Sequence, residues 1–70
     1  MVTSHQIRGA RAMIAMKQAD LAKAAGISLA TLNNIERGVS DPKASTLAAI
    51  QRALEAAGVE FIERGVRLKP

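Results

Sequence analysis

The sequence of 70 residues contains no cysteine, tryptophan or tyrosine, and its only histidine is His5. Without cysteine the chain has no disulfide, thiolate zinc site or cysteine nucleophile, which fits a cytoplasmic setting. No carboxylate pair, and no nucleophile with a base, surrounds His5, so we predict no catalytic residue, metal ion or cofactor. The five glycines are scattered, which argues against a glycine-rich phosphate loop. We therefore do not expect an enzyme.

Long apolar runs are also missing. No stretch of about 18 apolar residues could span a bilayer, and the N-terminus lacks the charged-then-apolar pattern of a signal peptide. Hydrophobic residues make up 49% of the chain, with alanine the commonest, and Phe61 is the only aromatic residue. Such a sequence predicts one small domain with a thin helical core, which would gain stability from dimerisation.

Basic residues outnumber acidic residues by ten to six, which gives a formal net charge of +4. The excess lies mainly in residues 1–43, where the basic residues are Arg8, Arg11, Lys17, Lys23, Arg37 and Lys43. This distribution favours a polyanion as the partner. The alternative is a charge that only keeps the protein in solution.

Residues 18–38, QADLAKAAGISLATLNNIERG, have the pattern of two short helices joined by a tight turn. The first helix is predicted over residues 18–25, where the positions of one buried stripe are Leu21, Ala22 and Ala25. Gly26 can adopt the left-handed backbone that ends a helix, with Ile27 folding back onto Ala22. Ser28 then follows as the candidate N-cap of the second helix.

The second helix is predicted over residues 28–37 and separates two kinds of side chain. One side holds Thr31, Leu32 and Ile35. The other side holds Leu29, Ala30, Asn33 and Asn34. Ile27 and Leu32 occupy the positions of a hydrophobic staple, which fixes how the chain enters a helix. A helix held by one face in this way is suited to present its other face to the major groove of DNA.

This stretch resembles the signature of the phage repressor, Cro and Xre family of helix-turn-helix proteins. The matching residues are Gln18, Leu21, Ala22, Gly26, the serine that opens the second helix, and Ile35-Glu36-Arg37-Gly38 at its end. The resemblance covers the chain from Ile7 to Leu54. Lys17 departs from it, because the family usually has serine or threonine at this cap.

The resemblance implies a mainly α, four-helix lambda-repressor-like domain that binds double-stranded DNA. Its expected function is sequence-specific transcriptional regulation, as a repressor that forms a homodimer on a pseudo-palindrome. The resemblance also implies an ion pair within about 4 Å between Arg11 and Glu36, which would tie the first helix to the recognition helix. The alternative is two independent surface charges.

Two kinds of DNA contact are expected. Phosphate contacts are expected from Arg11, Lys17, Gln18, Arg37 and Lys43. Base contacts are expected from Ser28, Leu29, Ala30, Thr31, Asn33 and Asn34. Asparagine offers adenine a donor and an acceptor, while leucine and alanine can contact only the thymine methyl group, so the half-site should lean toward A·T pairs. The alternatives are solvated asparagines, a solvated Lys43, and a core or dimer role for Leu29.

Small domains that resemble this family also act as antitoxins that hold a toxin, or as adaptors that dock another protein. A protein partner such as a toxin is therefore the second hypothesis. It does not exclude the first hypothesis, because antitoxins commonly bind DNA as well.

Two more helices should complete the DNA-binding domain over residues 1–58. The first is predicted over residues 2–16, with a capping box from Thr3 and Gln6 and a staple from Val2 and Ile7. Its core stripe is Ile7, Ala10 and Ile14. A loop is predicted over residues 38–43. The last helix should begin near residues 43–45 and end before Gly58, with an inward stripe of Leu47, Ile50, Leu54 and Ala57.

The tail over residues 59–70 departs from the family. Residues 59–62 and 66–69 are β-prone, and residues 63–65 resemble a three-residue hairpin loop with Gly65 in the left-handed conformation. An isolated hairpin is marginal in water, so it should either dock on the helices through Phe61 or pair with another chain. We favour dimerisation, with the candidate contacts Val59, Phe61, Ile62, Val66 and Leu68.

Overall fold

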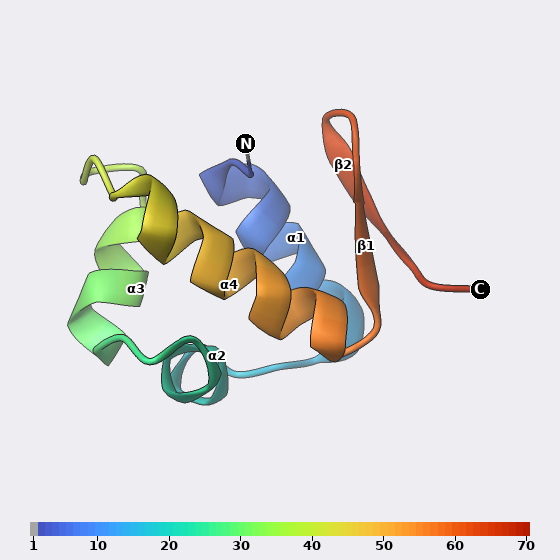
Figure 1. Cartoon of the computed structure of the whole chain (residues 1–70), viewed down its shortest axis with the longest axis horizontal. Coiled ribbons are helices and arrows are strands. Elements are labelled where there is room, and N and C mark those ends of the chain that lie inside the picture. Colours follow the sequence, from blue (N-terminus) through green and yellow to red (C-terminus); the bar gives the residue numbers. More distant parts are fainter. Residues whose placement is uncertain (1) are drawn as a thin grey trace.

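The computed structural model describes residues 2–70 as four helices followed by one β-hairpin (Figure 1). The elements in chain order are α1 (Ser4–Ile14), α2 (Gln18–Ala25), α3 (Leu29–Glu36), α4 (Ala44–Ala56), β1 (Val59–Ile62) and β2 (Gly65–Leu68). This architecture confirms the predicted fold class. No helix within residues 2–70 has both the length and the apolar character needed to cross a membrane.

Both ends of α1 are set by local backbone chemistry. The hydroxyl of Thr3 accepts from the N–H of Gln6, and the side-chain oxygen of Gln6 accepts from the N–H of Thr3, which is the predicted capping box. The helix ends earlier than predicted, because Ala15 adopts a left-handed φ of 55°. The N–H of Met16 then donates to the carbonyl oxygen of Arg11 at 2.9 Å.

The turn between α2 and α3 follows the sequence closely. Gly26 has a φ of 73°, and the N–H of Ile27 donates to the carbonyl oxygen of Ala22 at 3.0 Å. The hydroxyl of Ser28 caps α3 by accepting from the N–H of Thr31 at 3.0 Å. Lys17 makes no side-chain hydrogen bond at the start of α2, in agreement with its departure from the family pattern.

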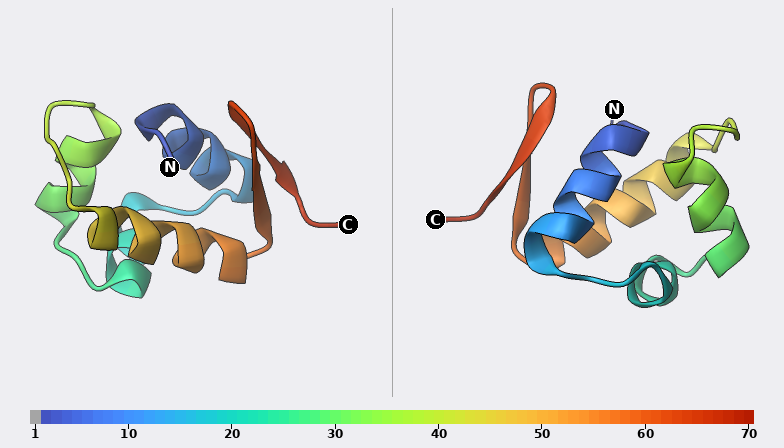
Figure 2. Two further views of the ribbon diagram at one scale, coloured as in Figure 1. Left: turned by 45° about the horizontal axis from the view of Figure 1, so that its top comes forward. Right: turned by 180° about the vertical axis from the view of Figure 1, so that it is seen from behind.

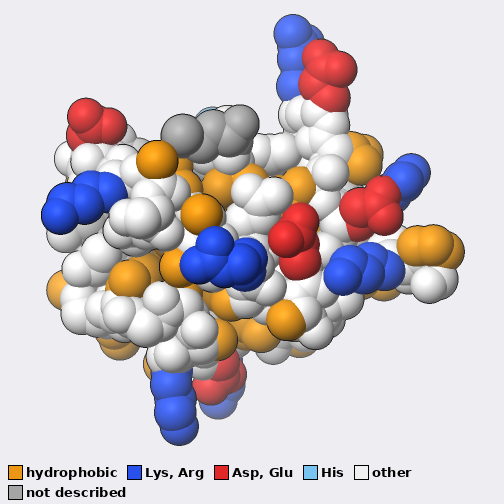
Figure 3. All heavy atoms as spheres, viewed as in Figure 1, with side chains coloured by type: hydrophobic (Ala, Val, Ile, Leu, Met, Phe, Trp, Pro, Cys, Tyr) orange, Lys and Arg blue, Asp and Glu red, His pale blue; other side chains and the backbone are white. Residues whose placement is uncertain are grey.

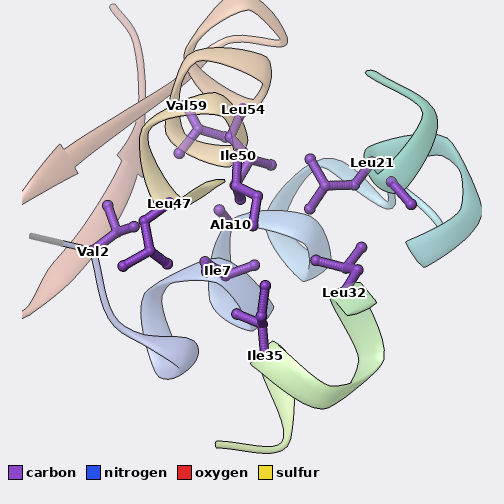
Figure 4. Packing of buried hydrophobic residues seen from close by; sticks show 11 residues of the cluster. Val2, Ile7, Ala10, Leu21, Leu32, Ile35, Leu47, Ile50, Leu54 and Val59 are labelled. Atoms are coloured by element: carbon purple, nitrogen blue, oxygen red, sulfur yellow. The ribbon is translucent and has the colours of Figure 1, made fainter. Parts of the chain in front are cut away.

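One apolar core joins the four helices to the first strand (Figure 4). It consists of Val2, Ile7, Ala10, Leu21, Ala22, Leu32, Ile35, Leu47, Ile50, Leu54 and Val59. Two predicted inward positions are wrong. Ala57 is exposed because α4 ends at Ala56, and Thr31 is exposed because its side chain lies beside the cap of α3.

The hairpin packs on the helices, with β1 beside α4 and β2 beside α1 (Figures 1 and 2). Phe61 and Val66 are partly buried against the core. The side-chain amide of Gln6 donates to the carbonyl oxygens of Ile62 at 2.9 Å and Gly65 at 3.1 Å. The hairpin is therefore anchored within a single chain, which was the first of the two predicted alternatives.

The hairpin loop is shorter than predicted. Ile62 pairs with Gly65, so the loop consists of Glu63 and Arg64, and Arg64 is the residue with a positive φ, at 61°. The prediction of a left-handed Gly65 is wrong because Gly65 is already paired in β2. The prediction that Val59 contacts a second chain is also wrong, because its side chain is fully buried in the core.

Candidate nucleic-acid interface

The two sides of α3 differ in exposure. Leu32 and Ile35 are buried in the core, and Glu36 is 2% exposed. Leu29 is 50% exposed, although it is a large apolar residue. The other exposed residues at and along α3 are Ser28, Ala30, Thr31 and Asn34, and Asn33 is half-buried. The side opposite the core therefore presents small, apolar and amide groups to solvent.

Glu36 joins α3 to both preceding helices. Its carboxylate accepts from Nε and Nη2 of Arg11 at 2.6 and 2.7 Å, and from Nε2 of Gln18 at 3.1 Å. The distance to Arg11 lies inside the 4 Å expected from the resemblance. Hydrogen bonding to Glu36 is the main cause that raises the pKa of Arg11 above its ordinary value, against the opposing effect of burial.

A second arginine, which the sequence analysis did not single out, contacts the end of α3. Arg8 lies three residues before Arg11, so both side chains project from one face of α1. One nitrogen of Arg8 donates to the backbone carbonyl oxygen of Glu36, and Nη2 lies 2.7 Å from Nδ1 of His5. The sequence does contain a signal for this contact. Arg8 precedes Arg11 by three residues on one helix, so a pairing of Arg11 with Glu36 places Arg8 near the end of α3 as well.

These contacts change the set of side chains that are free to bind phosphate. Arg11 also donates to the carbonyl oxygen of Met16 at 2.9 Å, and only 20% of its side chain is exposed. Its side chain is therefore held mainly by contacts within the protein, in agreement with the structural role that was also expected of it. Gln18 is half-buried, and its amide nitrogen is bound to Glu36.

The remaining expected phosphate contacts are exposed. Lys17 precedes α2, Arg37 follows α3, and Lys43 precedes α4. In Figure 3, basic side chains project beside α3 and below α2, and acidic side chains lie next to basic ones both below α2 and at the tip of the hairpin. Thus a positive charge is available at both ends of the helix-turn-helix segment.

Ser28 and Thr31 form a local pair at the start of α3. The hydroxyl of Ser28 donates to the hydroxyl oxygen of Thr31 at 2.8 Å and accepts from its N–H. Because the hydrogen of Ser28 is used within the protein, the hydroxyl of Thr31 keeps its own hydrogen for a further partner. Over residues 2–70, no three histidine, cysteine or acidic residues are grouped so that they could hold a metal ion.

Comparisons with known proteins agree with this geometry. A family model described as helix-turn-helix matches residues 7–62. The chain is also similar to the DNA-binding domain of the P22 C2 repressor (residues 1–76), whose structure was determined in solution by nuclear magnetic resonance. The two are 29% identical with a TM-score of 0.71, and the match covers 79% of this chain and 72% of that one. Among curated proteins, no match is found.

Proposed function

The chain belongs to the helix-turn-helix family of the Xre/Cro/C1 type, and from this membership we propose that it is a sequence-specific DNA-binding transcriptional repressor. One observation carries the proposal. The back of α3 is fixed by Leu32, Ile35 and Glu36, while Leu29 and its neighbours remain uncovered. A major groove about 12 Å wide admits one such helix, and only a rigidly held helix keeps its side chains in register with base edges.

Affinity in this proposal comes from phosphate contacts around α3. Lys17, Arg37 and Lys43 are exposed cations before and after the motif. At the start of α2 no side chain caps the free N–H groups, so a phosphate oxygen can accept them while Lys17 supplies positive charge. Gln18 contributes the remaining N–H of its side-chain amide, which is held in place by Glu36. These contacts carry no sequence information.

Base recognition is assigned to the exposed side of α3. Asn34 is exposed and offers both a donor and an acceptor, the pattern that matches the major-groove edge of adenine. Asn33 is half-buried, so it reaches a base at the margin of the contact. Leu29 and Ala30 can contact a thymine methyl group, and the hydroxyl of Thr31 can donate to a base acceptor. The proposed half-site therefore leans toward A·T pairs.

The proposal includes a homodimer on a pseudo-palindromic operator. One domain with few phosphate contacts binds weakly, and a two-fold symmetric pair reads two half-sites, spaced about 34 Å apart or a multiple of this distance. Because cations supply most of the affinity, binding should weaken steeply as salt concentration rises.

The test is selection of bound duplexes from a random pool at about 0.15 M salt. A recovered motif with two related half-sites supports the proposal, whereas equal retention of all duplexes contradicts it. A matched pair of variants then locates the interface. Lys43→Ala and Arg64→Ala each remove one exposed cation, but Arg64 lies in the hairpin loop. Only Lys43→Ala should lower the salt slope, by about one.

A further inference from the structure

The outer edge of β2 is a strand edge that no element within residues 2–70 pairs with. The N–H of Lys69 donates to the carbonyl oxygen of Gly58 at 2.9 Å, which marks that opposed pair as hydrogen-bonded. Hydrogen-bonded and non-hydrogen-bonded pairs alternate along an antiparallel ladder. The pairs of Val66 with Phe61 and of Leu68 with Val59 are therefore non-hydrogen-bonded. The backbone N–H and C=O groups of Val66 and Leu68 consequently point away from β1.

Apolar side chains accompany this edge. α1 and β2 run in the same direction, because Gln6 binds Gly65 and a Cβ atom at Gly9 would lie 3.6 Å from Cγ2 of Val66. Continuing along both elements leads to Met13 on α1 and Leu68 on β2. Met13 is 42% exposed and Leu68 is 55% exposed. Two exposed apolar side chains therefore lie at the corresponding ends of α1 and β2.

We propose that a second copy of this chain pairs along the outer edge of β2, in antiparallel orientation, with Val66 opposite Leu68 of the second copy. This contact rests on the homodimer of the proposed function and specifies how that homodimer forms. An added strand can pair with every one of the alternating N–H and C=O groups along an edge. The resulting sheet has the strand order β1-β2-β2-β1 across the two-fold axis.

The edge is self-complementary in this register. Val66 and Leu68 lie two residues apart, so a two-fold axis through Arg67 brings each one opposite the other and allows four backbone hydrogen bonds. Shifting the register by two residues in one direction places Arg64, which has a positive φ, in the ladder. Shifting it in the other direction places Pro70 there, which has no N–H to donate. The register centred on Arg67 is therefore the one that uses the edge fully.

The charges on the outer face are compensated before the two copies meet. Arg67 forms an ion pair with Glu60 on the neighbouring strand, with Nε 2.9 Å from the carboxylate oxygen. The two arginines that face each other across the axis are thus accompanied by two carboxylates. On the inner face, the exposed sides of Met13 and Leu68 from both copies become a single apolar strip.

The proposed contact leaves the DNA-reading surface uncovered. The hairpin and α3 lie at opposite ends of the longest dimension of the molecule, which measures 31 Å (Figures 1 and 2). Pairing at β2 therefore does not compete with binding through Leu29 or Asn34.

Disulfide trapping tests the register directly, because the chain has no cysteine of its own. In a non-hydrogen-bonded antiparallel pair the Cα atoms lie about 4.5 Å apart, which is within the range of a disulfide. Arg67→Cys should therefore form an interchain disulfide in mild oxidant. Glu60→Cys is the matched control on the same face, one strand further from the axis, and should remain a thiol. Equal cross-linking of the two variants, or none, overturns the proposal.

Sedimentation of the whole chain without DNA gives the second test. The wild-type protein should sediment at twice its monomer mass of 7.4 kDa at micromolar concentration. Leu68→Lys should lose the dimer and keep its helical circular-dichroism spectrum. Ile62→Lys alters a comparably exposed residue on the opposite face of the hairpin and should stay dimeric. A monomeric wild type, or an equally dimeric Leu68→Lys, overturns the proposal. Both results are independent of duplex selection, so either hypothesis can fail alone.

Discussion

Arg11→Met is predicted to lower the free energy of unfolding by about 3–5 kcal/mol. The side chain of Glu36 is 3% exposed, and Arg11 supplies two of the hydrogen bonds to its carboxylate. The variant leaves that negative charge buried with Gln18 as its remaining donor, while methionine keeps most of the apolar stem of arginine. Small domains are stable by roughly 0.05–0.15 kcal/mol per residue, so the loss is comparable with the total stability of this chain.

A double variant separates the buried charge from the packing. Adding Glu36→Gln to Arg11→Met removes the negative charge and keeps a side chain that Gln18 can contact. Because no ionic group then remains buried without a partner, we expect about 1–3 kcal/mol of the lost stability to return. If the double variant is less stable than Arg11→Met alone, the cost does not arise from an unpaired carboxylate.

Urea denaturation followed by far-ultraviolet circular dichroism is the suitable assay, because the chain has no tryptophan or tyrosine to report by fluorescence. Arg67→Met is the matched control. It breaks the ion pair with Glu60, whose two side chains are 61% and 36% exposed. An exposed pair is worth about 0–1 kcal/mol. Equal losses in Arg11→Met and Arg67→Met would refute the reasoning.

Four further predictions concern caps, the hairpin, DNA reading and pH. Ala15→Gly should raise the melting temperature measured by calorimetry, because a left-handed φ of 55° costs alanine about 1–2 kcal/mol. An unchanged or lower melting temperature would contradict a left-handed Ala15. Gln6→Ala removes two hydrogen bonds to the hairpin and should destabilise it by about 1–2 kcal/mol. Relative to wild type, amide hydrogen exchange should accelerate more in β1 and β2 than in α2. Asn34→Ala should weaken binding to the selected duplex by about 1–3 kcal/mol and leave non-specific binding unchanged, and equal losses on both would mean that it touches only backbone. Because the pKa of Arg11 is raised, the contribution of its charge to the free energy of unfolding is complete at neutral pH and is lost only as pH rises through that elevated pKa. The difference in free energy of unfolding between wild type and Arg11→Met, measured with urea, should therefore stay constant from neutral to mildly alkaline pH.

Features that depend on neighbouring residues were predictable from the sequence. The capping box of Thr3 and Gln6, the turn at Gly26 and the cap at Ser28 all form as expected, and α2 has the predicted bounds. Each depends on a hydrogen bond or a backbone conformation within five residues of chain. The exposed side of α3 also follows from local periodicity, apart from Asn33, which is half-buried, and Thr31, whose hydroxyl binds that of Ser28.

Features that depend on distant contacts were not predictable in the same way. Val59 and Leu68 have similar side chains and are paired, yet Val59 is buried and Leu68 is 55% exposed. The difference arises because Val59 directly follows α4 and lies over the core. Similarly, Gln6 was recognisable as a capping residue. Its side-chain amide also donates to Ile62 and Gly65 of the hairpin, which follow it by 56 and 59 positions, and these contacts could not be read from the sequence.

The burial of Glu36 links the stability of the fold to the proposed reading of DNA. α3 has eight residues, and a helix of this length is not stable alone in water, so its orientation is set by what its back contacts. Leu32 and Ile35 supply burial, which prevents a large rotation about the helix axis but, because it is non-directional, tolerates a small one. The bidentate contact from Arg11 is directional and fixes that rotation. Contacts with phosphates tolerate a small rotation of α3, whereas the paired hydrogen bonds proposed from Asn34 to a base edge would not. We therefore expect the buried ion pair to matter more for selectivity than for affinity.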